Sequence, residues 1–251
     1  MGKIVSIANN KGGVGKTTST FNLGVALSRL NKKVLIIDLD PQSSLSLYFG
    51  IEPLDINTTI YNVLIDDIDA KSLICHTNID NLDLLPSNIE LSKAELIMIS
   101  KIGREFILKD KLSDIKDIYD YILIDNSPSL GLLTINSLMA SDYIIAPTDP
   151  TYLAMRGLEI LDETVNEIKK FNKDLKFLGV VVTMFDQRTK HHNEVLEELK
   201  KRYHVFDSVI KRSIKFPDSC LSYYSIFEYA GDNFNGSVAY MKIAKEVVEN
   251  E

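Results

Sequence analysis

Six short apolar runs, spread along the whole chain, constrain its fold more than any other feature. They read KIVSIA (3–8), KVLIID (33–38), LDLLP (82–86), YILIDN (121–126), YIIAPT (143–148) and LGVVVT (178–183). Several are apolar at nearly every position, which is typical of strands that helices cover on both faces. Stretches of helical length lie between them, so the sequence predicts an α/β fold with a doubly wound, mainly parallel sheet.

The segments between these runs predict the helices of one domain. Amphipathic patterns of helical length cover 18–30, 105–119, 130–140, 158–171, 193–203 and 237–250. With 251 residues, of which 45% are hydrophobic, the chain can bury one substantial core. No long linker or low-complexity stretch divides the sequence, so we expect a single domain over residues 1–251.

Nothing in the sequence indicates a secreted or membrane-spanning protein. No apolar run reaches the roughly 18 to 20 residues that cross a bilayer. The N-terminus enters the first predicted strand with no room for a signal peptide. Cys75 and Cys220 lie far apart and outside any metal-ligand spacing, which fits thiols in a reducing cytoplasm. We therefore expect a cytoplasmic protein without stable membrane association.

A glycine-rich segment, GGVGKTT, lies between the first predicted strand and the first predicted helix. Glycine lets backbone N–H groups approach phosphate oxygens, and the helix N-terminus adds the positive end of its dipole. Lys16 is expected to bridge the β- and γ-phosphates of ATP, Thr17 to bind Mg²⁺ and Thr18 to contact the α-phosphate. The predicted nucleotide loop comprises Gly12, Gly13, Val14, Gly15, Lys16, Thr17 and Thr18.

A second lysine in this loop points to a particular family. Asn10 occupies the position of the first glycine in the general phosphate-loop pattern, and Lys11 follows it. The resulting pattern, K-G-G-x-G-K-[ST], resembles that of the deviant Walker ATPases, which include the ParA/Soj partition proteins, MinD and the nitrogenase iron protein. The resemblance implies that Lys11 reaches across a dimer interface to the ATP of the other subunit. One lysine from each side would offset the charge of two nucleotides held between the subunits.

Three aspartates follow predicted strands at the edge of the sheet where ligands bind in such folds. Asp38 and Asp40 end VLIIDLD, and strand alternation predicts that both side chains point to the same side. The resemblance implies that Asp40 orients or deprotonates the attacking water and that Asp38 supports the Mg²⁺ shell. A helix cap or turn formed by DPQSS is the alternative interpretation. Asp125 ends YILIDN and is expected to hold Mg²⁺ through water.

The resemblance extends over nearly the whole chain and favours the ParA/Soj branch. DLDPQSSLSLYFGI, LLPSNIELSKAEL and DYIIAPTDPTYLAMRGL resemble segments of that branch. Ser127 departs from the family, which usually has two prolines where this chain keeps only Pro128. MinD-like proteins end in a basic amphipathic membrane helix, whereas the last predicted helix here mixes Lys with Glu. The loop begins about ten residues into the chain, so no N-terminal helix-turn-helix domain is expected.

A basic segment stands out in an otherwise acidic chain. Residues 186–216 hold eight basic and five acidic residues, whereas the whole chain has a net charge of −7. Charge alone does not separate a DNA-binding surface from a solvated helix face, because NEVLEELKKRY has Glu–Lys pairs at helical spacing. The resemblance implies that Arg188, Lys211, Arg212 and Lys215 contact DNA phosphates. It also implies that Met184 and Phe185 flank the adenine ring.

The resemblance implies an ATPase that partitions chromosomes or plasmids, with Lys11, Lys16 and Asp40 as catalytic residues. Its ATP-bound homodimer would bind double-stranded DNA non-specifically on the nucleoid. A ParB-like centromere-binding partner would stimulate slow hydrolysis and release. Two alternatives remain. One is a MinD-like positioning ATPase on a membrane or protein scaffold, and the other is a DNA-bound switch that senses ATP without hydrolysing it.

Overall fold

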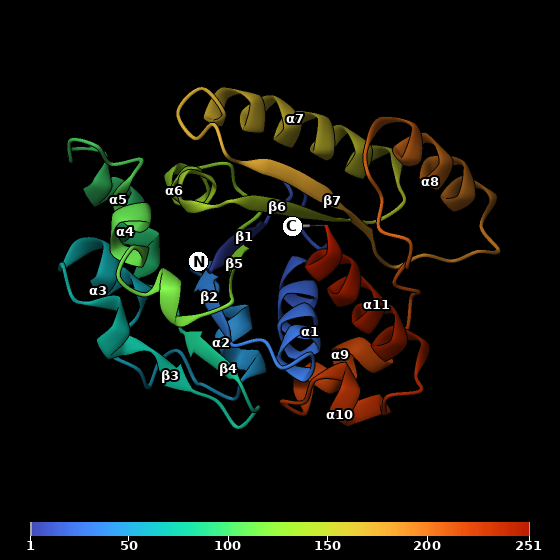
Figure 1. Ribbon diagram of the computed structural model, residues 1–251, viewed down its shortest axis with the longest axis horizontal. Helices are drawn as coiled ribbons and strands as arrows, with labels where there is room; N and C mark the ends of the chain where they lie inside the picture. The colour runs from blue at the N-terminus through green and yellow to red at the C-terminus, as the bar shows by residue number, and fades with distance from the viewer. Residues whose placement is uncertain (1, 251) are drawn as a thin grey trace.

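The computed structural model describes residues 2–250 and contains a seven-stranded sheet with helices on both faces (Figure 1). The strands are β1 (Lys3–Ile7), β2 (Val34–Leu39), β3 (Cys75–His76), β4 (Leu82–Leu85), β5 (Tyr121–Asn126), β6 (Tyr143–Thr148) and β7 (Lys176–Val182). They lie in the order β3-β4-β2-β5-β1-β6-β7. Every neighbouring pair is parallel except β3 with β4, which confirms the predicted sheet.

The helices divide between the two faces and one end of this sheet (Figure 1). They are α1 (Lys16–Arg29), α2 (Ser44–Tyr48), α3 (Ile60–Ile65), α4 (Leu91–Met98), α5 (Ile107–Leu112), α6 (Leu132–Ala140), α7 (Tyr152–Ile168), α8 (Lys190–Arg202), α9 (Lys215–Leu221), α10 (Ile226–Ala230) and α11 (Asn235–Glu249), with short 3₁₀ helices η1 (Ala70–Leu73) and η2 (Lys116–Ile118). None of the helices within residues 2–250 combines the length and the apolar character needed to cross a bilayer.

Alternate side chains of an inner strand enter different hydrophobic cores. Val34 and Ile36 of β2 pack in the core that contains α1 and α11. Leu35, Ile37 and Leu39 pack in the core that contains α3, α4 and α5. Because successive side chains of a strand point to opposite faces, a strand covered on both faces must be apolar at every position. This explains the unbroken apolar runs in the sequence.

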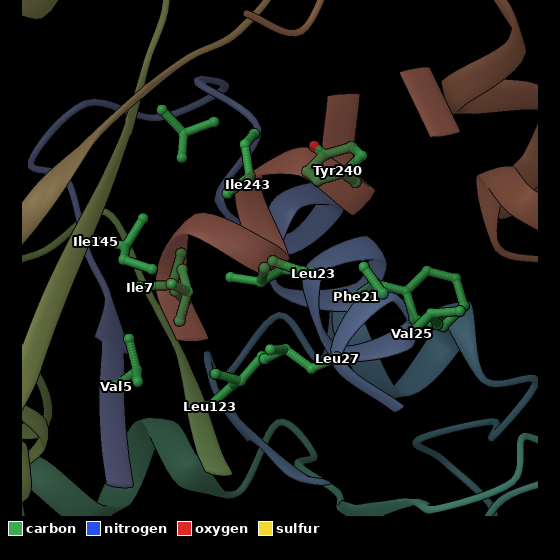
Figure 2. Close-up of a cluster of buried hydrophobic side chains, with 14 of the residues drawn as sticks. Val5, Ile7, Phe21, Leu23, Val25, Leu27, Leu123, Ile145, Tyr240 and Ile243 are labelled. Atoms are coloured by element: carbon green, nitrogen blue, oxygen red, sulfur yellow. The ribbon is translucent and has the colours of Figure 1, made fainter. Parts of the chain in front are cut away.

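The first core joins the beginning of the chain to its last helix. Figure 2 shows Val5 of β1 and Leu123 of β5 on one side, with Leu27 of α1 and Ile243 of α11 opposite them. A third core lies between β6, β7, α7 and α8. Packing of α1 against both the sheet and α11 fixes the helix that follows the glycine-rich loop.

Several local features differ from the prediction, and the helices α2, α3, α4, α9 and α10 lie outside the expected helical segments. The helix expected over 105–119 is interrupted, because α5 ends at Leu112 and only η2 follows it. The hydroxyl of Ser113 donates to the Asp110 carbonyl oxygen at 2.7 Å, and such a side-chain bond competes with helix continuation. The two-residue strand β3 was also not predicted, since so short a segment gives no periodic signal.

The central strands bring four loops to one edge of the sheet. In the sheet, β1 lies between β5 and β6, and β2 is the other neighbour of β5. Because these strands are parallel, the loops after them meet at their carboxyl ends. These loops cover 8–15, 40–43, 127–131 and 149–151. Ligands of open α/β sheets bind at such an edge.

Candidate functional site

The segment between β1 and α1 forms a loop whose conformation depends on glycine. Gly13 and Gly15 have φ values of 72° and 82°, in the left-handed region that residues with a Cβ atom rarely adopt. The Thr183 hydroxyl donates to the Val14 carbonyl oxygen at 2.8 Å and ties the loop to the end of β7. Because α1 begins directly after Gly15, its free N–H groups and positive dipole end face the loop. This is the geometry of a phosphate-binding loop.

Lys16 opens α1 and its side chain turns back across the loop. Its Nζ atom donates to the Lys11 carbonyl oxygen at 3.0 Å. Burial lowers the pKa of Lys16, whereas the carboxylates of Asp125 and Asp40 act in the opposite direction. The ammonium group therefore lies between the loop backbone and two carboxylates, where a phosphate chain would meet its charge.

Asp125 lies at the carboxyl end of β5 and is completely buried. Its Oδ1 atom accepts a hydrogen bond from the Thr20 hydroxyl at 3.0 Å, whereas Oδ2 has no hydrogen-bond partner among the described residues. Burial, and then the charge of Asp38, raises the pKa of Asp125 to about 8, and the Thr17 and Thr20 hydroxyls offset this in part. A buried carboxylate oxygen without a donor fits a cation that carries its own water.

The residues around Asp125 fit magnesium that binds together with phosphate. In the part of the chain that the structure describes, no group of three or more His, Cys, Asp or Glu side chains is placed to hold a metal ion by itself. Mg²⁺ usually keeps several waters and takes its remaining oxygens from one or two side chains and from a nucleotide. Thr17 and Asp125 match that requirement.

Asp38 and Asp40, which strand alternation predicts on one side of β2, have different surroundings. Asp38 is fully buried, and its Oδ2 atom accepts hydrogen bonds from the Ser46 N–H (2.9 Å) and hydroxyl (2.7 Å). Burial raises the pKa of Asp38 to about 6. β2 ends at Leu39, and Asp40, the next residue, lines the cavity beside the loop. Asp38 anchors α2 and acts on Asp125 through its charge, and of the two only Asp40 faces the cavity.

Two adjoining cavities lie along this edge of the sheet. The first, of about 400 Å³, is lined by Gly12, Gly13, Gly15, Lys16, Thr17, Thr18, Asp40, Gln42, Ser44, Tyr48, Pro128 and Met184. The second, of about 330 Å³, is lined by Gly15, Thr18, Thr183, Met184, Ile210, Lys211, Arg212, Ser213, Ile214, Phe216, Pro217 and Tyr240. We call them the phosphate cavity and the base cavity. A polar cradle joined to a largely apolar slot matches a phosphate chain and a nucleobase.

Met184 and Phe185, both expected beside adenine, separate in the structure. Met184 lines both cavities and has a φ of 51°. Phe185 packs in the core under α7 and α8, with its ring centroid 6.1 Å from that of His192. Phe185 does not line the base cavity. Of this pair, Met184 is the residue placed to contact a base.

Lys11 is held within its own chain. Its Nζ atom lies 2.9 and 3.0 Å from the two carboxylate oxygens of Asp149 and 3.1 Å from the Thr151 hydroxyl. Its backbone N–H donates to Asn9 Oδ1 at 2.9 Å, which fixes the start of the loop. Both partners of the ion pair are partly shielded, with side-chain exposures of 30% for Lys11 and 18% for Asp149. A lysine that reaches a second subunit must first leave this carboxylate.

Three residues of the site were not singled out from the sequence. Asp149 follows the fifth predicted strand, and a carboxylate at that edge was a usable signal. Thr20 lies one helical turn after Lys16, so helix periodicity could have identified it beside the loop. Tyr48 carries no signal, because its position depends on how α2 packs against α1.

The basic segment divides into neutralised and unpaired cations. On α8, Lys200, Lys201 and Arg202 each form ion pairs with glutamates. Arg188 makes a bidentate pair with Asp186, at 3.0 and 2.9 Å. These charges therefore belong to solvated or locally neutralised groups.

Lys211, Arg212 and Lys215 lie closer to the base cavity and are exposed. No salt bridge to any of the three is found among residues 2–250. Lys215 Nζ lies 4.8 Å from the centre of the Phe234 ring. These three residues supply the positive charge available to an external anion.

The loop, the carboxylate on the neighbouring strand and the paired cavities are the features of a P-loop nucleotide-binding protein. A protein-family model described as an AAA domain matches residues 2–177. The sporulation initiation inhibitor protein Soj of Bacillus subtilis is 42% identical over 253 residues, covering 100% of both chains. The chain therefore belongs to this family of P-loop ATPases and, within it, to the ParA/Soj group.

Solved structures agree with this assignment. A cobyrinic acid a,c-diamide synthase from Mycobacterium smegmatis, with bound ADP and magnesium, superposes with a TM-score of 0.87 and 32% identity. The match covers 99% of this chain and 95% of that one. A plasmid partition protein from Borrelia burgdorferi gives a TM-score of 0.80 and 32% identity, with 100% and 99% covered.

Proposed function

We propose that the protein is a Mg²⁺-dependent ATPase that partitions DNA. The observation that carries this proposal is the pair of joined cavities, with Lys16 and Asp40 lining one and Met184 lining both. The similarity to Soj and to a plasmid partition protein supports the partition role, and the ADP and magnesium of the synthase support the cofactors.

Each residue of the phosphate cavity has a distinct task in this proposal. The loop N–H groups and Lys16 bind the phosphate chain. Thr17, and Asp125 through water, hold Mg²⁺, which when bound supplies positive charge to the phosphate oxygens. Asp40 accepts a proton from, or orients, a water in the cavity, and the Gln42 N–H fixes its Oδ1 atom at 2.9 Å.

Slow turnover follows from the same cavity. Among the residues described, no arginine lines it. An arginine at this position accelerates phosphoryl transfer by large factors in other P-loop enzymes. Hydrolysis that waits for a partner suits a switch whose ATP and ADP states differ in assembly. We assign the stimulating role to a ParB-like centromere-binding protein.

Dimerisation supplies the missing cation in this scheme. With ATP bound, Lys11 leaves Asp149 and contacts the nucleotide of a second copy, so that two nucleotides lie between the subunits. The dimer presents two copies of Lys211, Arg212 and Lys215 to one DNA duplex. Two linked sites bind far more tightly than one, so ATP controls DNA binding through assembly. The protein would thus be a cytoplasmic, nucleoid-associated ATPase.

The test is DNA binding across a salt series with ATP, with ADP and without nucleotide. Wild type should bind duplex of mixed sequence only with ATP, and binding should weaken steeply with salt. Lys11→Ala and Arg212→Ala should each lose binding. Lys200→Ala is the matched control, because Lys200 is paired with Glu197 on α8 and should leave binding intact.

Three outcomes would contradict parts of the proposal. ATP hydrolysis without DNA binding in any nucleotide state would remove the partition role. Co-sedimentation with liposomes in its place would favour a MinD-like positioning ATPase. Turnover in Asp40→Ala equal to that of wild type would remove the hydrolytic role of Asp40 and leave a nucleotide sensor.

A further inference from the structure

Loop 127–131 joins β5 to α6 and forms part of the wall of the phosphate cavity. Its Pro128 lines that cavity. A Cβ atom added to Gly12 would lie 4.0 Å from the Cβ atom of Pro128, so this loop also packs against the phosphate loop. The position of loop 127–131 therefore determines the shape of the cavity in which the phosphates of ATP would lie.

A carboxylate of α4 binds the far end of this loop. The Oε1 atom of Glu95 accepts a hydrogen bond from the Leu133 N–H, in the first turn of α6, at 3.1 Å. Among the residues that the structure describes, no cation forms an ion pair with Glu95. A carboxylate at a helix N-terminus satisfies a free N–H group and is stabilised by the helix dipole. Glu95 therefore caps α6 from a different helix.

Gly131, the residue before α6, leaves room for this carboxylate. A Cβ atom added to Gly131 would lie 2.3 Å from Glu95 Oε1. The backbone of Gly131 is not strained, because its φ of −74° and ψ of −172° are open to any residue. The Gly131 N–H donates to the Ser129 hydroxyl oxygen at 3.1 Å, and the Thr134 hydroxyl donates to the Ser129 carbonyl oxygen at 2.5 Å. The loop and the capped start of α6 are thus one connected unit.

The helix that carries Glu95 is fixed to the sheet and to the segment that carries Asp40. Three side chains of α4 are fully buried in the core that contains β2: Leu91, Ala94 and Met98. Just before α4, the Ser87 hydroxyl donates to the Asp40 carbonyl oxygen at 3.0 Å. Segment 87–95 therefore connects two walls of the phosphate cavity, one formed by Asp40 and the other by loop 127–131.

We propose that Glu95 is a positioning residue for ATP hydrolysis. By binding the start of α6, its carboxylate keeps loop 127–131 in a fixed position relative to Asp40. A small displacement of the groups around a reacting centre slows the chemical step by a large factor. Lys16 and the N–H groups of the phosphate loop bind the phosphates without Glu95, so Glu95 acts on turnover and not on affinity. This inference rests on the proposed function, because it concerns the hydrolytic role assigned to Asp40.

The first experiment compares turnover with affinity. Glu95→Ala should lower kcat for ATP about tenfold, the effect of one hydrogen bond to a charged group, and leave the Kd of Mg²⁺–AMPPNP within about twofold. Glu95→Gln keeps an acceptor for the Leu133 N–H and should retain most of kcat. Glu90→Ala is the matched control, because Glu90 lies just before α4 in an exposed pair with Lys93. A wild-type kcat in Glu95→Ala, or equal losses of kcat and affinity, overturns the proposal.

A second variant displaces the carboxylate without removing it. Gly131→Ala places a Cβ atom against Glu95 Oε1, and the flexible end of that side chain can turn away, so the protein should still fold. Its kcat should fall about as far as that of Glu95→Ala. In the Glu95→Ala background there is no carboxylate to displace, so adding Gly131→Ala should cause no further loss. Additive losses in the double variant would show that the two residues act independently and would overturn the proposal.

The third measurement does not depend on hydrolysis. Hydrogen–deuterium exchange with mass spectrometry reports on the backbone N–H groups of 127–134 in the protein without nucleotide. Exchange should be about fivefold faster in Glu95→Ala and Gly131→Ala, and unchanged in Glu95→Gln and Glu90→Ala. If wild type turns over no ATP, the proposed function fails, but this measurement still decides whether Glu95 holds the loop. Exchange at the wild-type rate in Glu95→Ala overturns the proposal.

Discussion

The phosphate loop and the basic segment differ in how completely the fold prepares them for a ligand. The loop holds Gly13 and Gly15 in the left-handed conformation, and Lys16 and Asp125 are already buried beside it. In the basic segment most cations on α8 are neutralised by glutamates, and only the short stretch 211–215 keeps free charge. Backbone geometry thus determines the phosphate loop, whereas the charge of the basic segment depends on which cations form no ion pair.

The largest expected effect is on ATP binding at the phosphate loop. Lys16→Met removes the buried ammonium group, and loss of charge-assisted hydrogen bonds to phosphate should weaken ATP binding by about hundredfold or more. Calorimetric titration with Mg²⁺–ATP measures this. Lys215→Met, a change in the basic segment, should leave ATP binding within about twofold of wild type. Equal losses in both variants would contradict the separation of the two regions.

The next effect concerns the folding stability that is lost when the two buried carboxylates ionise without a bound ligand. The pKa values of Asp38 and Asp125 are raised to about 6 and about 8, so the folded protein keeps protons that the unfolded chain has released. Stability without ligand should therefore fall as pH rises from about 4 to 8. In Asp125→Asn this decline should shrink, and the variant should exceed wild type by on the order of 2 kcal/mol at pH 8.

Thermal unfolding between pH 5 and 8.5 measures this difference. Mg²⁺–ATP should stabilise wild type and have little effect on Asp125→Asn, because the variant lacks the cation-binding carboxylate. A pH profile identical in both proteins would show that Asp125 carries no raised pKa. Stabilisation of both by Mg²⁺–ATP would remove Asp125 from the magnesium site.

A smaller effect concerns Lys11, which forms an ion pair with Asp149 of its own chain. Asp149→Asn removes the charge that pairs with Lys11, so the lysine should leave its own chain more readily. ATP-dependent dimerisation should then strengthen about fivefold, as measured by analytical ultracentrifugation. Glu167→Gln is the control and should not change it, because Glu167 of α7 forms an exposed pair with Lys170, just beyond that helix. Weaker dimerisation of Asp149→Asn would mean that Asp149 itself contacts the second subunit.

The smallest effect sharpens the comparison within the basic segment. Asp186 forms a bidentate pair with Arg188, so Asp186→Asn should free that arginine for phosphate contacts. DNA affinity with ATP should rise about twofold and depend more steeply on salt. Combining this change with Arg188→Ala should abolish the gain. No change in the salt dependence would place Arg188 outside the DNA surface.

The sequence predicted best what the local backbone decides. The six apolar strands and the glycine-rich loop are confirmed in the fold, because strand burial and left-handed glycines are encoded in consecutive residues. The different burial of Asp38 and Asp40 was not predicted, because the strand pattern does not show that β2 ends at Leu39. Where a strand stops depends on its neighbours and not on its own pattern.

Contacts between distant segments could not be predicted from the sequence. The pairing of Lys11 with Asp149 joins residues 138 positions apart, and no periodicity links them. The division of the basic segment likewise depends on whether each cation meets a carboxylate of another element, as Arg202 meets Glu159 of α7. Residue type predicted the chemistry of these groups, and tertiary packing determined their partners.

The hydrogen bond between Tyr240 of α11 and Ser19 of α1 has a consequence for how the protein is made. The two hydroxyls lie 3.1 Å apart, and Tyr240 also lines the base cavity. A ribosome delivers residue 19 long before residue 240, so the nascent chain carries a phosphate loop while its base cavity still lacks a wall. Nucleotide capture therefore waits until α11 has emerged, and premature termination upstream of it leaves a polypeptide unable to enclose the base.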